Sequence, residues 1–100
     1  MSSLSGKQKR HLRALGHHLK PVVQMGQKGA TEALIGKVRS ELTAHELIKV
    51  KVSPDAPVNA KEAAEDLHEH TGAAVAQVIG RIVVLYKARK KKPSIKLPAE

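Results

Sequence analysis

Two glycines lie three residues apart in the segment Gly26-Gln27-Lys28-Gly29, between a short apolar run and Thr31. Glycine lacks a Cβ, so the backbone there can adopt positive φ and approach a bulky anion closely. Thr31 is expected to begin a helix, whose first amides carry a partial positive charge that favours phosphate. Lys28 adds a full charge. The segment therefore indicates a phosphate-binding loop, although a plain strand-to-helix turn would use glycines in the same way.

Other kinds of chemistry find little support. The chain has no cysteine, which excludes disulfides and thiolate metal sites. The glycine spacing differs from that of nucleotide-binding and dinucleotide-binding loops, and no serine stands in a nucleophile motif. His17 and His18 are adjacent, so on a helix they would point about 100° apart and could not both face one metal well. We therefore predict a non-enzymatic binding protein without a cofactor or metal; a metal-dependent hydrolase that uses His17 or His18 remains an alternative.

The charge distribution favours a polyanionic partner. The 100 residues carry a formal net charge of +9. Segments 1–20 and 73–100 are strongly basic, whereas segment 53–72 is acidic, and such polarity is typical of a protein with one side facing nucleic acid. An anionic membrane surface is the second partner class. The basic side chains predicted to contact RNA outside the glycine loop are Lys7, Lys9, Arg10, Arg13, Lys20, Lys49 and Lys51.

The single aromatic ring of Phe, Trp or Tyr type restricts how RNA could be recognised. Sheet-based readers of single strands stack bases on several aromatic rings. Tyr86 is the only such residue in the chain, and it falls in an apolar run expected to be buried. Recognition of the backbone and shape of structured RNA is therefore the consistent expectation.

Apolar periodicity predicts an α/β domain of two-layer type with a mixed four-stranded sheet. In residues 46–52, Ile48 and its alternate neighbours should face the core, while Leu47, Lys49 and Lys51 face the other way. Right-handed crossovers should place the second and third helices on one face of the sheet. The predicted order is helix 5–19, strand 22–25, helix 31–44, strand 46–52, helix 59–71 and strands 74–79 and 82–87.

Local signals mark the ends of these elements. Ser5, Thr31 and Asn59 are predicted helix N-caps, and Gly72 is the predicted stop of the third helix. Residues 1–88 form the predicted domain, and residues 89–100 a basic tail that reads as a solvated, mobile extension able to add affinity for phosphate. Neither a secretory signal nor an apolar run of roughly 20 residues is present, so a cytoplasmic protein with no membrane partner is expected.

Several short segments follow one another along the chain in a characteristic order. They are Leu19-Lys20-Pro21-Val22-Val23, Gly26–Gly29, His45–Lys51, Thr71-Gly72 and, within 77–87, Gln77-Val78-Ile79-Gly80 and Val84-Leu85-Tyr86-Lys87. This order resembles that of the CRM domain family, and more closely that of the small bacterial YhbY-type proteins. Ala30 and Ala73 depart from the family pattern, which tends to have a bulky aliphatic residue and a glycine there.

This resemblance implies a sheet similar to that of the C-terminal domain of translation initiation factor three. It also implies that residues 26–29 are a KH-like RNA contact, and that the protein acts on precursors of the large ribosomal subunit. The expected partner is 23S rRNA in pre-50S particles, bound by a protein that is monomeric in isolation. The alternative function is an adaptor that docks on a ribosomal protein through the acidic third helix or the face of Leu47, Lys49 and Lys51.

Overall fold

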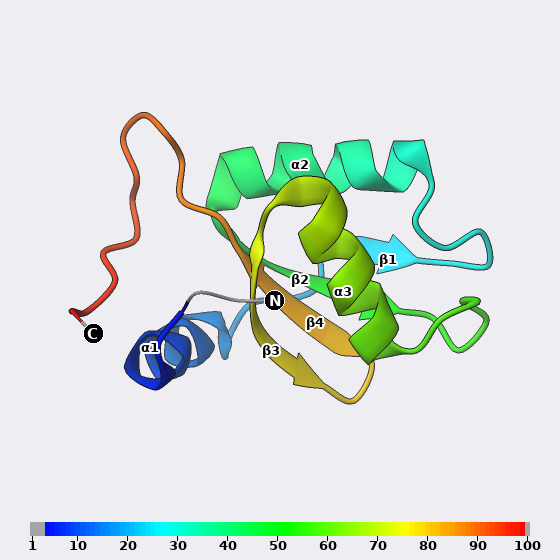
Figure 1. Ribbon diagram of the computed structural model, residues 1–100, viewed down its shortest axis with the longest axis horizontal. Helices are drawn as coiled ribbons and strands as arrows, with labels where there is room; N and C mark the ends of the chain where they lie inside the picture. Colours follow the sequence, from blue (N-terminus) through cyan, green and yellow to red (C-terminus); the bar gives the residue numbers. More distant parts are fainter. Residues whose placement is uncertain (1–3, 100) are drawn as a thin grey trace.

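The computed structural model describes residues 4–99, so residues 1–3 of the predicted domain and Glu100 of the predicted tail lie outside the described residues. The predicted order of elements is confirmed (Figure 1). The elements are α1 (Gly6–Gly16), β1 (Val23–Met25), α2 (Glu32–His45), β2 (Leu47–Val52), α3 (Ala60–Thr71), β3 (Ala74–Ile79) and β4 (Ile82–Tyr86).

The four strands form one mixed sheet in the order β1-β2-β4-β3. The β1 and β2 strands run parallel, whereas β4 pairs antiparallel with both of its neighbours. The inner position of β4 agrees with its unbroken apolar sequence, because an inner strand is covered more completely than an edge strand. Gly80 has a φ of 56° in the two-residue turn between β3 and β4, as the predicted hairpin requires.

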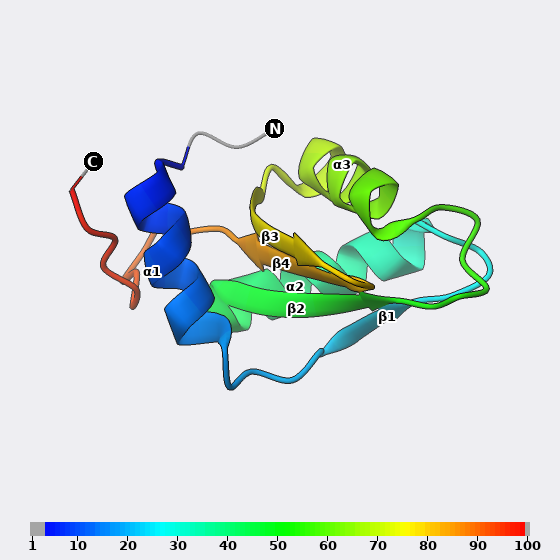
Figure 2. The same ribbon diagram turned by 90° about the horizontal axis from the view of Figure 1, so that it is seen from below.

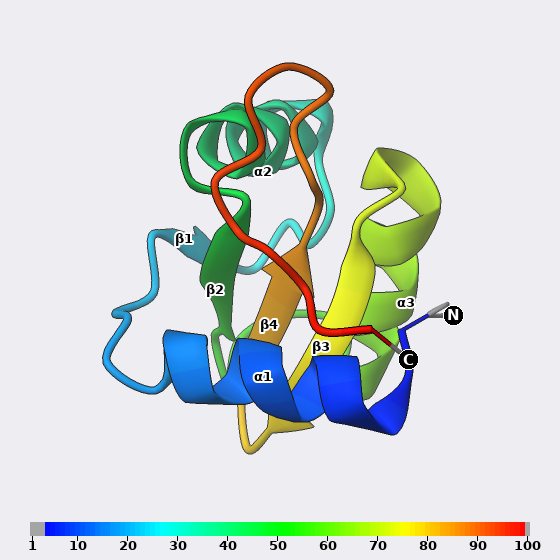
Figure 3. The ribbon, with the colours of Figure 1, turned by 90° about the vertical axis from the view of Figure 1, so that its left-hand side faces the viewer.

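Helices cover both faces of the sheet (Figures 1 and 3). The α2 and α3 helices pack on one face, which confirms the predicted layer, and α1 crosses part of the other face. The predicted alternation in β2 is also confirmed, since Ile48 and Val50 lie in the α2/α3 core and Leu47 lies under α1. The ring of Tyr86 belongs to the core under α1 and is only 7% exposed, as predicted for a packing residue.

Side chains satisfy the helix ends where the sequence predicted caps. The Oγ of Ser5 accepts a hydrogen bond from the Gln8 amide, and Asn59 forms the same reciprocal capping box with Glu62. Gly72 ends α3 with a φ of 74°, a left-handed conformation that glycine adopts without steric penalty. Within residues 4–99, no helix combines the length and the apolar character needed to cross a membrane.

The first helix is shorter than predicted. It ends at Gly16, where the prediction placed its end at Leu19. Leu12 is fully buried, but Leu15 is 44% exposed and Leu19 is 39% exposed, so the expected stripe of three leucines does not pack as a unit. The prediction was wrong because it assumed a helix packed along its whole length, while α1 contacts the sheet through Leu12 and Gly16.

The basic tail differs most from the prediction. Instead of extending into solvent, residues 89–98 fold back along the body, and Ile95 and Leu97 pack against the core under α1. The Nε2 of Gln8 donates a hydrogen bond of 3.1 Å to the carbonyl of Pro98. The tail folds back because it is held by the side-chain carboxylate of Glu46. This residue lies between α2 and β2, and its backbone φ is 62°.

The Glu46 carboxylate is fully buried and, among residues 4–99, accepts hydrogen bonds only from the tail. Its Oε2 accepts from the Arg89 amide at 2.7 Å. Its Oε1 accepts from the Ser94 amide and hydroxyl, each at 2.6 Å, and from the Ile95 amide at 3.1 Å. Burial alone would raise the pKa of Glu46, but these hydrogen bonds outweigh it and lower the pKa to about 2.

Replacing the carboxylate should therefore uncouple the tail from the domain. At pH 7, Glu46→Gln is expected to lower the free energy of unfolding by about 2 kcal/mol, because hydrogen bonds to a charged acceptor are lost. The pKa of this group is lower in the folded protein, so its contribution is complete above the unfolded value of 4.5 and disappears as the pH falls towards 2. Chemical denaturation at several pH values should show the two proteins converging in stability over that range; a constant difference would contradict the prediction.

Candidate nucleic-acid interface

The glycine loop joins β1 to α2 and is closed by two backbone hydrogen bonds. The Gly29 amide donates to the Gly26 carbonyl, and the Thr31 amide donates to the Gly29 carbonyl, both at 3.0 Å. Gly29 has a φ of 67°, and a Cβ built on it would lie 3.0 Å from Cγ of Pro57. The second glycine is thus required by the fold, because both its conformation and its contact with the 53–58 loop exclude a side chain.

The first half of the loop is open. Gly26 does not adopt a left-handed φ, and a Cβ built on it would meet nothing within 4 Å. Gln27 and Lys28 are exposed beside it. Since the fold does not require a glycine at position 26, the absence of a side chain there leaves backbone accessible to a ligand.

Thr31 has a structural role at the start of α2. Its Oγ1 accepts a hydrogen bond of 3.1 Å from the Leu34 amide, which makes it the helix N-cap. The amides of the first helical turn have no acceptor within the helix and carry the positive end of its dipole. Glu32 also lies in this turn and is exposed, so its carboxylate lowers the local positive potential. Lys28 must supply most of the attraction for an anion.

The basic residues of α1 are distant from this loop. In Figures 1 and 2 the loop lies at one end of the long axis and α1 at the other, on a molecule whose longest extent is 38 Å. Lys7, Arg10 and Arg13 are exposed and Lys9 is partly buried. The loop and the helix therefore do not form one patch, and a ligand that touches both must be long.

Lys49 and Lys51 lie between these two sites. They alternate with the core residues of β2 and so share the sheet face of Leu47, which α1 covers only in part. Lys51 pairs in register with Gln24 on one side and with Ile82 on the other. Lys20 is exposed in the segment that leads from α1 to β1. The predicted residues on α1 and β2 thus share one side of the sheet, and the glycine loop stands at its far end.

Acidic side chains gather elsewhere. Glu62, Glu65 and Glu69 are exposed on α3, which packs on the opposite face of the sheet from α1. The polarity predicted from the sequence is therefore present in three dimensions, because a polyanion on the α1 side would not face this helix.

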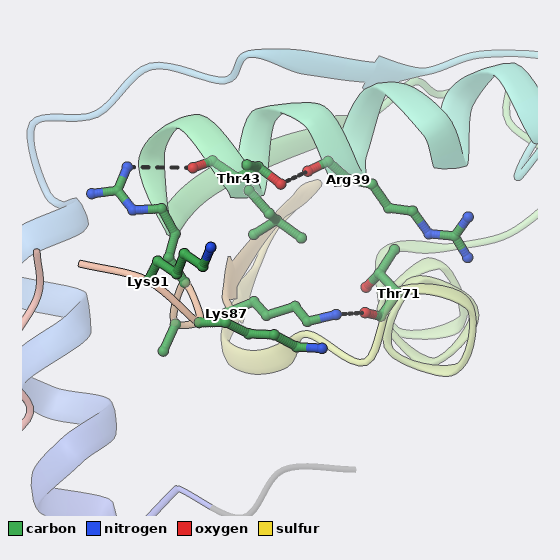
Figure 4. Close-up of a pocket in the computed structure, with 9 residues that line it drawn as sticks. Arg39, Thr43, Thr71, Lys87 and Lys91 are labelled. Carbon is green, nitrogen blue, oxygen red and sulfur yellow. Dashed lines mark hydrogen bonds between the residues drawn. The ribbon is translucent and has the colours of Figure 1, made fainter. Parts of the chain in front are cut away.

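The fold brings together one group of cations that the sequence did not connect. Side chains from α2, from the end of β4 and from the first residues of the tail line a hollow of about 430 Å³ (Figure 4). Arg39 could not be linked to the basic tail from the sequence, because it lies 48 residues or more before the other basic residues of the hollow. The basic residues that line this hollow, here named the cationic pocket, are Arg39, Lys87, Arg89, Lys90 and Lys91.

The alternatives drawn from the sequence are weakened by geometry. The rings of His17 and His18 contact each other edge to face with centroids 5.0 Å apart, yet residues 4–99 contain no group of three potential metal ligands. Leu47 is buried under α1, so it cannot belong to the adaptor surface proposed with Lys49 and Lys51.

Comparison with known proteins identifies the family. Residues 4–87 match the model of the CRS1 / YhbY (CRM) domain. The Bacillus subtilis protein named "Probable RNA-binding protein YqeI" is 40% identical over 95% of this chain and 99% of its own length. A Haemophilus influenzae protein named "RNA-binding protein" is 41% identical over 98% of both chains.

A solved structure shares the fold. The solution structure of the hypothetical protein SAV1595 from Staphylococcus aureus has a TM-score of 0.77 and 42% identity, and the match covers 95% of this chain and 99% of that one. The match of the family model includes the glycine loop and every helix and strand described above. The chain belongs to the CRS1 / YhbY (CRM) domain family.

Proposed function

We propose that this protein is a non-catalytic RNA-binding protein that grips the phosphate backbone of structured RNA through the loop Gly26–Gly29. The observation that carries the proposal is the open backbone at Gly26 next to the exposed ammonium of Lys28. A glycine that the fold does not require leaves room for a ligand to approach, and Lys28 attracts an anion at that point. The names of the Bacillus and Haemophilus relatives support RNA as the ligand.

The RNA is large-subunit ribosomal RNA in precursor particles in the cytoplasm, and the protein, a monomer in isolation, assists their assembly. The family resemblance implies this target. The lack of stacking platforms supports it, since Tyr86 is buried and a binding mode based on phosphates suits a folded RNA better than an unpaired strand. Further basic side chains extend the contact along the α1 side of the sheet. They are the exposed Lys7, Arg10, Arg13, Lys20 and Lys51 and the partly buried Lys9 and Lys49.

Charge reversal at the loop should weaken binding through a lost phosphate contact. Lys28→Glu is expected to reduce affinity for a transcribed rRNA fragment and to lower the slope of log affinity against log salt by about 0.7–0.9. The matched control is Lys37→Glu, an equal charge change at an exposed site within α2. Filter binding at several salt concentrations measures both variants. If the two variants behave alike, Lys28 makes no specific contact.

The two glycines should respond differently to alanine. Gly29→Ala is expected to destabilise the fold by about 1–2 kcal/mol, because its positive φ is strained for any other residue and Pro57 lies too close. Gly26→Ala is expected to leave the free energy of unfolding within about 0.5 kcal/mol of the original value.

Affinity for the rRNA fragment should nevertheless fall for Gly26→Ala, since the added methyl group blocks approach of the backbone. Thermal unfolding and RNA titration of the same preparations separate the two effects. Unchanged affinity for Gly26→Ala would remove Gly26 from the interface and leave the loop with a purely structural role.

A second function is favoured by one feature of the surface. The side chains of Leu15, Leu19 and Val22 are each more than a third exposed and border a hollow of about 420 Å³ beside the segment that leads into β1. Such a cluster suits contact with a ribosomal protein. Binding to deproteinised rRNA supports the RNA function, whereas retention only on particles that contain protein supports the adaptor.

A further inference from the structure

The cationic pocket gathers five positive side chains and no carboxylate among the residues that line it. Arg39 comes from α2, Lys87 follows β4, and Lys91 belongs to the tail, so three separate parts of the chain converge there (Figure 4). Like charges brought together by folding repel one another and destabilise the compact state. This cost would be relieved by an anion, which makes the pocket a candidate binding site.

The C-terminal ends of α2 and α3 lie beside the pocket, and free carbonyls there would repel an anion. Their carbonyls instead accept hydrogen bonds from the cations of the pocket. The Nζ of Lys87 donates to the Thr71 carbonyl at 2.6 Å, and Arg39 donates to the His70 carbonyl at 2.6 Å. Arg89 donates to the carbonyls of Thr43 and Ala44 at 3.3 and 3.2 Å. The negative ends of α2 and α3 are thus already neutralised by the cations that line the hollow.

These cations keep donors for a ligand. Lysine has three N–H groups and arginine five, and Lys87 and Arg39 each donate one hydrogen bond to a carbonyl, so further N–H groups remain for a ligand. The Nε of Arg89 is buried without a hydrogen-bond partner. Within the described residues, the ammonium groups of Lys90 and Lys91 have no hydrogen-bond partner, and both residues are exposed.

The segment that carries these two lysines is held at both ends. Oε2 of Glu46 binds the Arg89 amide before them, and Oε1 binds the Ser94 and Ile95 amides after them. Between these anchors the chain turns back at Lys92, where φ is 52° and the carbonyl accepts a hydrogen bond from Arg89. Lys90 and Lys91 are therefore presented by a short, pinned loop, which lowers the entropy lost when they bind a ligand.

We propose that the cationic pocket binds a phosphate group of the RNA backbone, as a second contact separate from the glycine loop. This inference rests on the proposed RNA-binding function and adds a site to it. The loop lies at the start of α2 and the pocket near its end. The helical rise over the twelve steps from Thr31 to Thr43 therefore places the two contacts about 18 Å apart along the helix. Two linked contacts raise the affinity for an RNA that reaches both, and a short oligonucleotide cannot do so.

The test uses the double variant Lys90→Glu/Lys91→Glu in the full chain. Affinity for a transcribed rRNA fragment should fall, and the salt slope should decrease by about 0.7–0.9, as expected for the loss of one phosphate contact. The matched control is Lys37→Glu/Lys61→Glu, which changes the net charge equally at exposed positions outside the pocket. Thermal unfolding checks that each protein remains folded. Equal losses in both double variants, or no loss in the pocket variant, would overturn the proposal.

A second measurement tests, without RNA, whether the pocket binds an anion. Titration of the unaltered protein with inorganic phosphate, followed by amide chemical shifts, should give saturable changes at residues 87–91 that the pocket variant lacks. Absence of these changes would overturn the site. Saturation by phosphate with unaltered rRNA binding of the pocket variant would make it a small-anion site and overturn its role as an RNA contact.

The two proposals fail in distinguishable ways. If Lys28→Glu weakens rRNA binding and the pocket variant does not, the proposed RNA contact at the pocket is overturned and the proposed contact at the glycine loop is supported. If the unaltered protein binds no rRNA, the proposed function is overturned, and the phosphate titration still shows whether the pocket holds an anion.

Discussion

A single buried carboxylate organises one end of this molecule. Glu46 lies where α2 ends and β2 begins, and it takes a positive φ that carries the chain from helix to strand. Its backbone continues the sheet, since its carbonyl accepts from the Lys87 amide, while its side chain binds the tail at three successive points. A buried charge is tolerated only when it is well hydrogen-bonded, so the tail and the helix-to-strand junction depend on each other. The pKa of Tyr86 in the adjacent core is raised, first by burial of its phenol and then by the negative charge of Glu46.

Much of the fold follows from short-range patterns. The alternation in 47–52 gave the two faces of β2 correctly, and capping residues at Thr31, Asn59 and Gly72 gave helix ends to within a residue. The end of α1 was not predictable in this way, because Leu15 and Leu19 have helical spacing but each stays more than a third exposed. Local spacing reports which residues could be buried, and only the tertiary arrangement decides which of them are.

The tail could not be predicted because its partner lies more than 40 residues earlier in the chain. A run of lysines is normally solvated, and nothing near Glu46 in sequence marks its carboxylate as a receptor for amides. A faint signal existed in the apolar pair Ile95 and Leu97 within a polar segment. The candidate interface was predictable to the same extent. The glycine spacing located the loop, but the distance between the loop and α1 follows from the tertiary arrangement, which puts them at opposite ends of the molecule.

The anchoring of the tail has a consequence for how freely its sequence can change. Three of the four hydrogen bonds from the tail to the Glu46 carboxylate come from main-chain amides, which every residue except proline possesses. The attachment of the tail to Glu46 therefore depends on the path of the main chain and hardly on the side chains at positions 90 and 91. The charge, size or chemistry of these two side chains can be changed by mutation or by design while the attachment stays intact.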